Sequence, residues 1–339
     1  MSRHDNKHQQ APCHWRPCVQ STIPVTANEV IPLRRPLDTN AVLIMTVLCA
    51  VWGFQQVAIK AIAADVAPVM QIAVRSGIAA ILVLAADRLF GSARWLRGAG
   101  VAGLVTGVLF AAEFLFVAEG LTRTTAAHMA VFLYTAPLFA ALGLHAFAPG
   151  ERLSPLQWGG VVIAFAGITA TFLLHGGTSD SHHTDNSLLG DLMGICGGAA
   201  WGFTTVVVRT SALSQAPAAQ TLFYQLAAAF IVLLVVALAS GQTSLTWTTP
   251  VWMSLGFQAI IVSFASYLTW FVLLRRYLAA RLGVLSFLTP LFGVAFGHVL
   301  LNEPVDVSFA AGAILVLGGA FIVNGESLLQ SLFRKVEGA

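Results

Sequence analysis

The stretch AVWGFQQVAIK at residues 50–60 occurs a second time as AAWGFTTVVVR at residues 199–209, at a constant offset of 149. Both copies are apolar apart from two central polar residues, and each ends in a single basic residue, Lys60 or Arg209. Further pairs follow at offsets of 149 to 153, namely Pro68 and Pro217, Gln71 and Gln220, Pro137 and Pro290, and Glu151 and Glu303. Small changes of offset are what loop insertions produce, so we infer that the chain consists of two related halves.

The composition excludes an ordinary water-soluble protein. Only 10% of the 339 residues are charged, whereas about 25% are charged in typical globular chains. Apolar residues make up 57% of the chain, and the mean hydropathy is +0.79. A soluble protein of this length needs a charged shell that this sequence does not provide. We therefore predict an all-α integral membrane protein.

Ten apolar segments follow the polar N-terminal region, each close to the roughly 20 residues that cross a bilayer as a helix. We place them at residues 41–60, 68–87, 98–118, 124–147, 155–174, 189–210, 218–240, 250–273, 278–301 and 306–324. Five segments fall in each related half. The sequence therefore predicts ten transmembrane helices in two five-helix repeats.

The same segments divide the chain into five regions. Residues 1–40 are polar for most of their length and lack the apolar stretch of a secretory signal, so we expect a disordered cytoplasmic tail. The other regions are a first repeat at 41–174, an outer linker at 175–188, a second repeat at 189–324 and a cytoplasmic C-terminal tail at 325–339.

The distribution of basic residues predicts the orientation. With the N-terminus in the cytoplasm, eleven Lys and Arg residues flank the helices on the cytoplasmic side, and two, Lys60 and Arg123, lie on the other. Both termini are therefore expected inside the cell. Because each repeat has an odd number of helices, the second repeat crosses the membrane upside down, as in the inverted repeats of many secondary transporters.

The segments that carry the repeat also resemble a known family. Residues 116–127 read FVAEGLTRTTAA, residues 134–141 read YTAPLFAA, and the second half has FLTPLFG at 287–293 followed by NEP at 302–304. Together with the Trp-Gly-Phe openings, this set is similar to the EamA-type transporters of the drug/metabolite transporter superfamily. The resemblance extends over about residues 41–324. It implies a bacterial exporter of the inner (plasma) membrane, with a central cavity among the first, third, fourth, sixth, eighth and ninth helices.

Two charged residues, Arg75 and Glu113, lie well inside predicted helices. Arg75 is seven residues from Pro68 and Glu113 is seven residues from Gly120, near the outer ends of their helices, which is a depth of about 10 Å at roughly 1.5 Å per residue. Charges at this depth are costly and usually face the bundle interior. We expect an Arg75–Glu113 pair and leave its role open between a structural ion pair, proton coupling at Glu113 and a substrate-carboxylate anchor at Arg75.

Uncharged polar and aromatic residues extend this candidate pathway. The repeat mates Trp52 and Trp201 are candidates to line a cavity, although the glycine after each tryptophan equally suits close helix packing. In the eighth segment, residues 263, 266, 267 and 270 follow the i, i+3, i+4, i+7 spacing of one helix face. The predicted pathway residues are Trp52, Gln55, Gln56, Arg75, Glu113, Tyr134, Trp201, Thr204, Thr205, Ser263, Ser266, Tyr267 and Trp270.

Pro137 and Pro290 are matched prolines inside the fourth and ninth segments. A proline inside a helix frees a backbone carbonyl and permits a kink. We predict hinges at both positions, with a static kink as the alternative.

The sequence thus predicts a secondary active transporter that exports amino acids or similar small metabolites by alternating access. The candidate lining mixes aromatic and uncharged polar groups, which favours a compact, partly apolar solute, whereas a phosphorylated substrate would require more inward basic residues. No Walker sequence for ATP occurs in the chain. The alternatives are a non-transporting membrane subunit or sensor and a membrane-embedded enzyme.

We expect no enzymatic activity, cofactor, metal or nucleic-acid partner. Two of the four cysteines, Cys13 and Cys18, lie in a loose Cys/His-rich tail without the spacing of a metal site. The expected partners are a small-molecule substrate, membrane lipids and, as a hypothesis, protons as the coupling ion. The sequence leaves the oligomeric state open.

Overall fold

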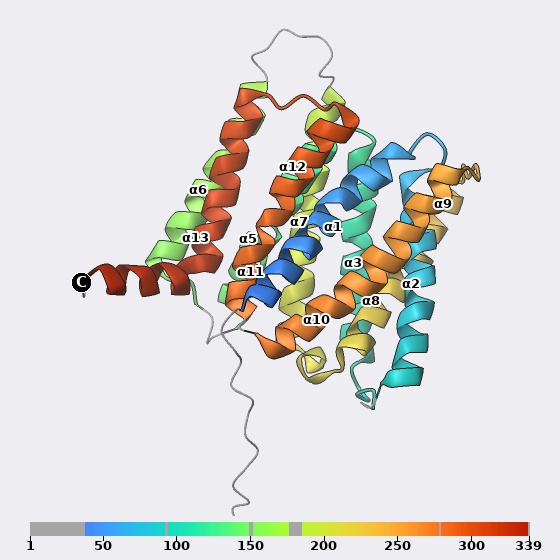
Figure 1. Cartoon of the computed structure of the whole chain (residues 1–339), viewed down its shortest axis with the longest axis horizontal. Helices are drawn as coiled ribbons and strands as arrows, with labels where there is room; N and C mark the ends of the chain where they lie inside the picture. Colours follow the sequence, from blue (N-terminus) through green and yellow to red (C-terminus); the bar gives the residue numbers. More distant parts are fainter. Residues whose placement is uncertain (1–37, 92–93, 149–151, 176–184, 278, 338–339) are drawn as a thin grey trace, which may run out of the picture. The chain divides into compact units, whose positions relative to one another are not determined.

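The computed structural model describes residues 38–91, 94–148, 152–175, 185–277 and 279–337, and these ranges are almost entirely helical (Figure 1). The first half contains α1 (Thr39–Ala61), α2 (Pro68–Phe90), α3 (Gly100–Leu121), α4 (Ala126–Leu133), α5 (Ala136–Phe147) and α6 (Pro155–His175). The second half contains α7 (Asp185–Thr210), the short η1 (Ala212–Gln215), α8 (Ala218–Ala239), α9 (Thr249–Gly256), the π-helical η2 (Phe257–Ser266), α10 (Tyr267–Arg276), α11 (Ala279–Ser286), α12 (Leu288–Leu301) and α13 (Val307–Glu337). An isolated antiparallel bridge joins Val66 and Leu245.

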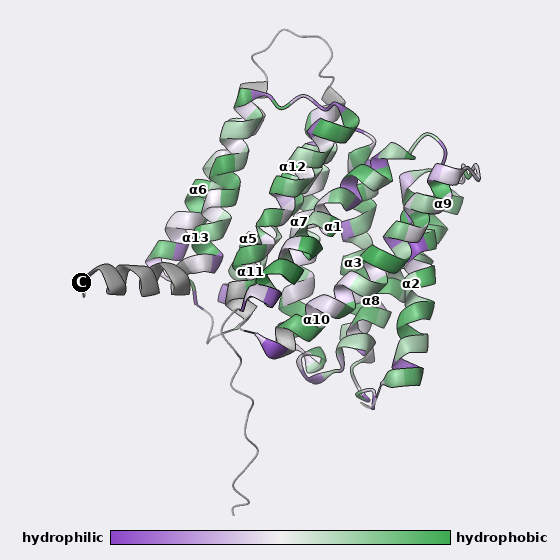
Figure 2. Cartoon of the chain, viewed as in Figure 1, coloured by the Kyte–Doolittle hydropathy of each residue, from purple (hydrophilic) through white to green (hydrophobic). Residues whose placement is uncertain are grey.

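The described helices have the length and composition of membrane spans. Nine helical stretches are long and apolar enough to cross a bilayer, and the apolar helix Pro155–Thr171 is shorter. Figure 2 shows that apolar residues dominate along most of the helices. The chain is therefore an all-helical, multi-pass membrane protein. The predicted N-terminal tail up to residue 37 and residues 176–184 of the predicted linker lie outside the described residues.

Two of the predicted helices are interrupted close to their prolines. Segment 124–147 consists of α4 and α5, which are separated at residues 134–135, and segment 278–301 consists of α11 and α12, which are separated at Phe287. A proline lacks the backbone N–H and clashes with the carbonyl four residues earlier. The affected carbonyls belong to the last residues of α4 and α11, so Pro137 and Pro290 explain why both helices break at equivalent places.

The eighth predicted segment is continuous but changes its winding. It runs as α9, then η2 over Phe257–Ser266, then α10. In a π-helix the hydrogen bonds connect residues i and i+5, so residues four to five apart lie over one another. The C-terminal helix also differs from expectation, because α13 continues to Glu337 through the segment that we predicted as a tail.

Helices of the two halves pack against each other through small residues. In particular, α1 packs along α12, α5 along α7, α2 along α8 and α6 along α13 (Figure 1). At the α1–α12 crossing, a Cβ atom on Gly53 would lie 2.8 Å from the backbone nitrogen of Gly293. At the α7–α5 crossing, a Cβ atom on Gly202 would lie 2.7 Å from the carbonyl oxygen of Ala136. These repeat-mate glycines therefore permit two equivalent close crossings between the halves.

Candidate functional site

The centre of the candidate site is formed by Arg75 on α2 and Glu113 on α3. Their exposed fractions are only 1% and 5%. Within the described part of the chain, no hydrogen-bond partner reaches Nε or Nη1 of Arg75 or Oε2 of Glu113. Buried polar groups are normally satisfied, so two neighbouring charges in this state require an explanation.

The predicted direct pair between these two residues is wrong in this structure, because no Arg75–Glu113 ion pair forms among the described side chains. The guanidinium carbon of Arg75 instead lies 4.4 Å from the centre of the Phe114 ring. A cation over an aromatic face is stabilised by the ring quadrupole, which accounts for this placement. The two charges remain close enough to attract each other electrostatically.

Tyr267 connects this centre with other predicted pathway residues. It lies within range of the charges of Arg75 and Glu113, and it packs against the apolar cluster that contains Phe110 and Phe114. The ring centres of Tyr267 and Trp52 are 6.5 Å apart. Residues from four separate helices, α1, α2, α3 and α10, therefore meet around this tyrosine.

The aromatic side of the site is fixed by Trp52. Its indole Nε1 donates a hydrogen bond to Ser266 Oγ over 2.8 Å, and its ring packs edge-on against Trp270 with centres 5.7 Å apart. Trp201 has a related position in the other half, where it packs edge-on against Tyr134. Tyr134 in turn contacts Phe287, its repeat mate at the break before α12.

The polar stripe of the eighth segment faces inward. Ser263 and Ser266 are buried, and so is Gln258, whose Nε2 donates to Oε1 of Gln71 over 3.2 Å. Gln71 itself donates to the backbone carbonyl of Ile59. The helical spacing of the sequence placed Ser263 and Ser266 on one face, and the π-helical winding of η2 brings Gln258, which lies outside that spacing, onto the same face.

The remaining predicted residues differ in whether their side-chain hydrogen-bonding groups have partners. Gln55 and Gln56 are buried, and Oε1 of Gln56 has no hydrogen-bond partner among the described residues. Thr204 and Thr205 donate their hydroxyls to carbonyls of their own helix, at 2.9 Å and 3.3 Å. The threonine hydroxyls are thus occupied by the backbone, whereas Gln56 retains a free acceptor.

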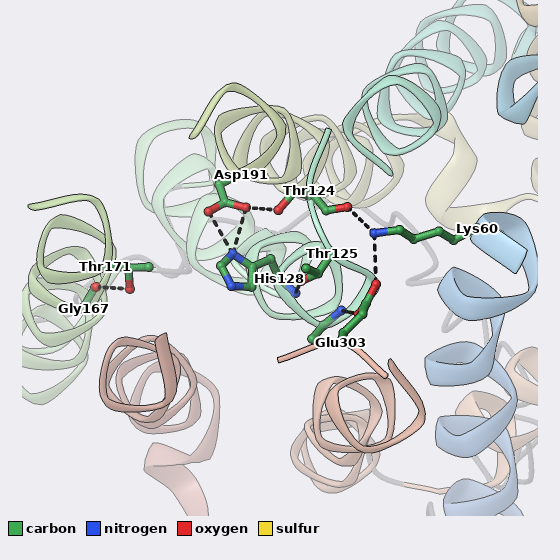
Figure 3. Close-up of polar contacts among 9 residues, drawn as sticks. Lys60, Thr124, Thr125, His128, Gly167, Thr171, Asp191 and Glu303 are labelled. Atoms are coloured by element: carbon green, nitrogen blue, oxygen red, sulfur yellow. Dashed lines mark hydrogen bonds and ion pairs between the residues drawn. The ribbon is translucent and has the colours of Figure 1, made fainter. Parts of the chain in front are cut away.

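A second group of charges lies where α1 and α12 end, and Figure 3 shows its contacts. Lys60 Nζ forms an ion pair with Glu303 Oε1 at 2.9 Å and donates to the backbone carbonyl of Thr124. The Glu303 carboxylate also accepts from the backbone nitrogens of Ala126 and Ala127, at 2.9 Å and 3.1 Å. A carboxylate that accepts N–H groups at a helix N-terminus is favourable, so Glu303 both caps α4 and binds α1.

A buried His128–Asp191 pair lies beside this cap (Figure 3). His128 Nδ1 is 2.9 Å from Asp191 Oδ2, and the hydroxyl of Thr124 donates to Asp191. The imidazole stacks on the ring of Phe309, with centres 3.9 Å apart. We call Lys60, Glu303, His128 and Asp191 the end cluster. Asp191 and His128 were not among the predicted site residues, although a carboxylate at the start of an apolar segment and a histidine inside one are visible in the sequence.

A cleft of about 610 Å³ lies at the opposite end of α1. Its lining residues come from the start of α1 and from α10, and include Asp38, Leu43, Ile44, Thr269, Leu273, Arg276 and Tyr277. The predicted pathway residues are not among those lining this cleft. No group of three or more His, Cys, Asp and Glu residues suited to a metal occurs in the described ranges, and the Cys/His-rich tail lies outside them.

Comparisons with known proteins agree with this architecture. The model of the EamA-like transporter family matches residues 39–173 and 188–325. An "Uncharacterized transporter" from Archaeoglobus fulgidus is 28% identical over 68% of this chain and 77% of its own length. A "Probable amino-acid metabolite efflux pump" from Escherichia coli (strain K12) is 26% identical over 80% of this chain and 90% of its own.

A solved crystal structure has a similar fold. Its TM-score is 0.58 at 23% sequence identity, and the similarity covers 84% of this chain and 96% of the other. The family match includes both halves and most of the described helices. The chain therefore belongs to the EamA-like transporter family.

Proposed function

We propose that this protein is a secondary active transporter that exports amino acids or similar small metabolites across the inner membrane. The observation that carries this proposal is the unsatisfied charge of Arg75 and Glu113 deep among apolar helices. Ionisable residues inside a membrane are expensive, and they commonly mark substrate or ion pathways. The name of the Escherichia coli relative supports the substrate class.

The proposed topology is ten transmembrane helices in two inverted five-helix repeats, with both termini in the cytoplasm. In this arrangement α4 and α5 together form one crossing, as do α9 to α10 and α11 to α12. The matched breaks at residues 134–135 and at Phe287 support the repeat. Discontinuous helices in corresponding positions of two halves are typical of transporter binding sites.

The contacts between the two halves support alternating access. Lys60–Glu303 and His128–Asp191 each join a residue of the first half to one of the second. In the proposed topology both lie at the outer end, so both must separate before the pathway opens outward. The breaks before Pro137 and Pro290 then serve as the hinges about which each half bends.

Glu113 is the proposed site of proton coupling, because it is a carboxylate buried inside a helix with one oxygen that lacks a partner among the described residues. The test is counterflow uptake of pooled radiolabelled amino acids into proteoliposomes, with and without a pH gradient. Wild-type uptake is expected to be saturable and to depend on the gradient. Uptake by Glu113→Gln at saturating amino acid is expected to lose that dependence.

Glu119→Gln is the matched control, because Glu119 is on the same helix but partly exposed and paired with Arg123. Its uptake should respond to the gradient as the wild type does. If no amino acid is taken up by the wild type, the proposed substrate class is wrong. If uptake by Glu113→Gln still follows the gradient, Glu113 is not the coupling site.

A further inference from the structure

The charges of Arg75 and Glu113 are complementary but separate. Both lie in the interior, attract each other across it, and leave two guanidinium nitrogens and one carboxylate oxygen without a partner among the described residues. Burying such groups unsatisfied costs free energy, and direct pairing is the usual remedy. Here Arg75 lies over Phe114 instead. The arrangement leaves one positive and one negative group in the interior with unused hydrogen-bonding capacity.

We propose that Arg75 and Glu113 form a split site for the two charged groups of a free α-amino acid. The substrate carboxylate accepts hydrogen bonds from the Arg75 guanidinium, and the substrate ammonium donates to the Glu113 carboxylate. This proposal rests on the proposed amino-acid transport, because it assigns the binding positions within that same pathway. The split site predicts that both charged groups of the substrate are required for binding. Amino-acid transport by itself does not predict this requirement.

The chemistry of each position matches one end of the ligand. Arginine is a permanently charged donor set that suits a carboxylate, and the Phe114 ring lies 4.4 Å from its guanidinium carbon. A carboxylate is an acceptor that suits an ammonium. In an α-amino acid the two groups are separated by a single carbon atom, so one small molecule satisfies two charges that do not touch each other.

Aromatic residues near Arg75 and Glu113 indicate where the rest of the ligand would lie. Tyr267 packs against the apolar cluster that contains Phe114, and Trp52 and Trp270 continue from it as an aromatic wall. A side chain that leaves the α-carbon toward this wall would contact aromatic rings. The split site therefore favours a zwitterion with an apolar or aromatic side chain.

Discrimination at this site should be strong against molecules that lack one charged group. An amine without the carboxylate leaves Arg75 unpaired, and an acid without the ammonium leaves Glu113 unpaired. A site that hydrogen-bonds a ligand group rejects the analogue lacking it, because its own buried polar groups then stay unsatisfied. We expect a loss of affinity of about 10- to 100-fold for each missing group.

The experiment uses three probes with the same side chain. L-Phenylalanine, 2-phenylethylamine and 3-phenylpropanoate compete with counterflow of the pooled radiolabelled amino acids in proteoliposomes. In the wild type, the amine and the acid should compete at least about tenfold more weakly than L-phenylalanine. In Arg75→Gln the amine should approach L-phenylalanine in potency, and in Glu113→Gln the acid should do so. Opposite changes in the two variants are not expected from a structural pair.

The double variant Arg75→Gln/Glu113→Gln tests the proposal without reference to a particular amino acid. A split site loses uptake of the whole pool when both charges are removed, whereas a structural ion pair keeps uptake because no uncompensated charge remains. Arg123→Gln is the control, because this arginine is paired with Glu119 at the end of its helix. Size-exclusion profiles and thermal unfolding in detergent establish that each variant is folded.

The outcomes separate the split site from the transport function. Uptake by the double variant at the wild-type level overturns the split site and leaves amino-acid transport in place. In the wild type, the amine or the acid could also compete as strongly as L-phenylalanine. This result likewise overturns the split site and leaves amino-acid transport in place. Absence of pool uptake by the wild type overturns both proposals together.

Discussion

The charges of the end cluster have partners, whereas those of Arg75 and Glu113 are left partly unsatisfied. Lys60 and Glu303 are joined at 2.9 Å, and His128 and Asp191 at the same distance. Arg75 and Glu113 are as deeply buried as His128 and Asp191, at 1% and 5% exposed against 5% and 1%, yet each has atoms without a partner in the described part of the chain. The same helices therefore hold one set of charges that is satisfied and another that is not.

This difference indicates which charges act in folding and which in transport. Glu303 is satisfied by Lys60 and by two backbone N–H groups, so it contributes to stability. Arg75 and Glu113 cost free energy in the folded state unless something else binds them. Regions that break the rules of packing and satisfaction are expected at functional sites.

The largest loss of stability is expected from Glu303→Ala. The change leaves Lys60 without its carboxylate and removes the acceptor for the nitrogens of Ala126 and Ala127. Because Lys60 is 29% exposed, most of the loss comes from the two backbone hydrogen bonds to the buried carboxylate, each of which contributes about 1.5–3 kcal/mol. Thermal and denaturant unfolding in detergent micelles measure the loss. A loss no greater than that of Glu119→Gln, for which less than about 1 kcal/mol is expected, would show that the end cluster is not a stabilising region.

A smaller loss is expected from Asp191→Asn. The amide keeps an acceptor for Thr124 but removes the charge that faces His128. A hydrogen bond to a charged group contributes about 1.5–3 kcal/mol, and part of it survives in the amide. The same unfolding measurements test this. An unchanged unfolding midpoint would mean that the buried carboxylate is not stabilised by its partners, as at Glu113.

Gly53→Ala should also weaken the end cluster, although it lies two turns away. A Cβ atom at this position meets the backbone of α12 at 2.8 Å, so α1 must move away from α12 and carry Lys60 away from Glu303. Forced overpacking costs about 1–3 kcal/mol. Gly159→Ala is the matched control, because nothing lies within 4 Å of a Cβ atom there. Equal stability of the two variants would exclude a tight α1–α12 crossing.

The smallest change in stability is expected from Arg75→Gln/Glu113→Gln. Replacing a buried ionic pair with neutral groups is often neutral or stabilising, so we expect a loss of less than about 1 kcal/mol or a gain. This is the opposite of the expectation for Glu303→Ala. A loss as large as that of Glu303→Ala would remove the contrast between the two regions.

The sequence was most informative where residues act through their own helix. The apolar segments predicted the helices, and the two prolines predicted the breaks near residues 134 and 287, because proline disrupts hydrogen bonds of its own backbone. The inward stripe with Ser263, Ser266 and Tyr267 followed from helical spacing alone. Its members remain candidate pathway residues, as do Arg75 and Glu113.

The sequence was least informative where partners come from distant segments. Asp191 is 63 residues from His128, and Glu303 is 177 residues from the nitrogen of Ala126. Equal depth of Arg75 and Glu113 suggested a contact, but the direction of the guanidinium depends on the Phe114 ring beside it. Such choices are made by tertiary packing and leave no periodic signal in the chain.

The π-helical segment Phe257–Ser266 has a consequence for insertions and deletions. A π-helical turn contains one residue more than an α-helical turn, so deleting a residue within it would let the helix wind regularly. The part before the deletion would then rotate by about 100° relative to the part after it, since an α-helix has roughly 3.6 residues per turn. Gln258 would turn away from Gln71, while Tyr267 and Trp270 kept their places. A change of one residue in length therefore reorients Gln258 and leaves Tyr267 and Trp270 in place.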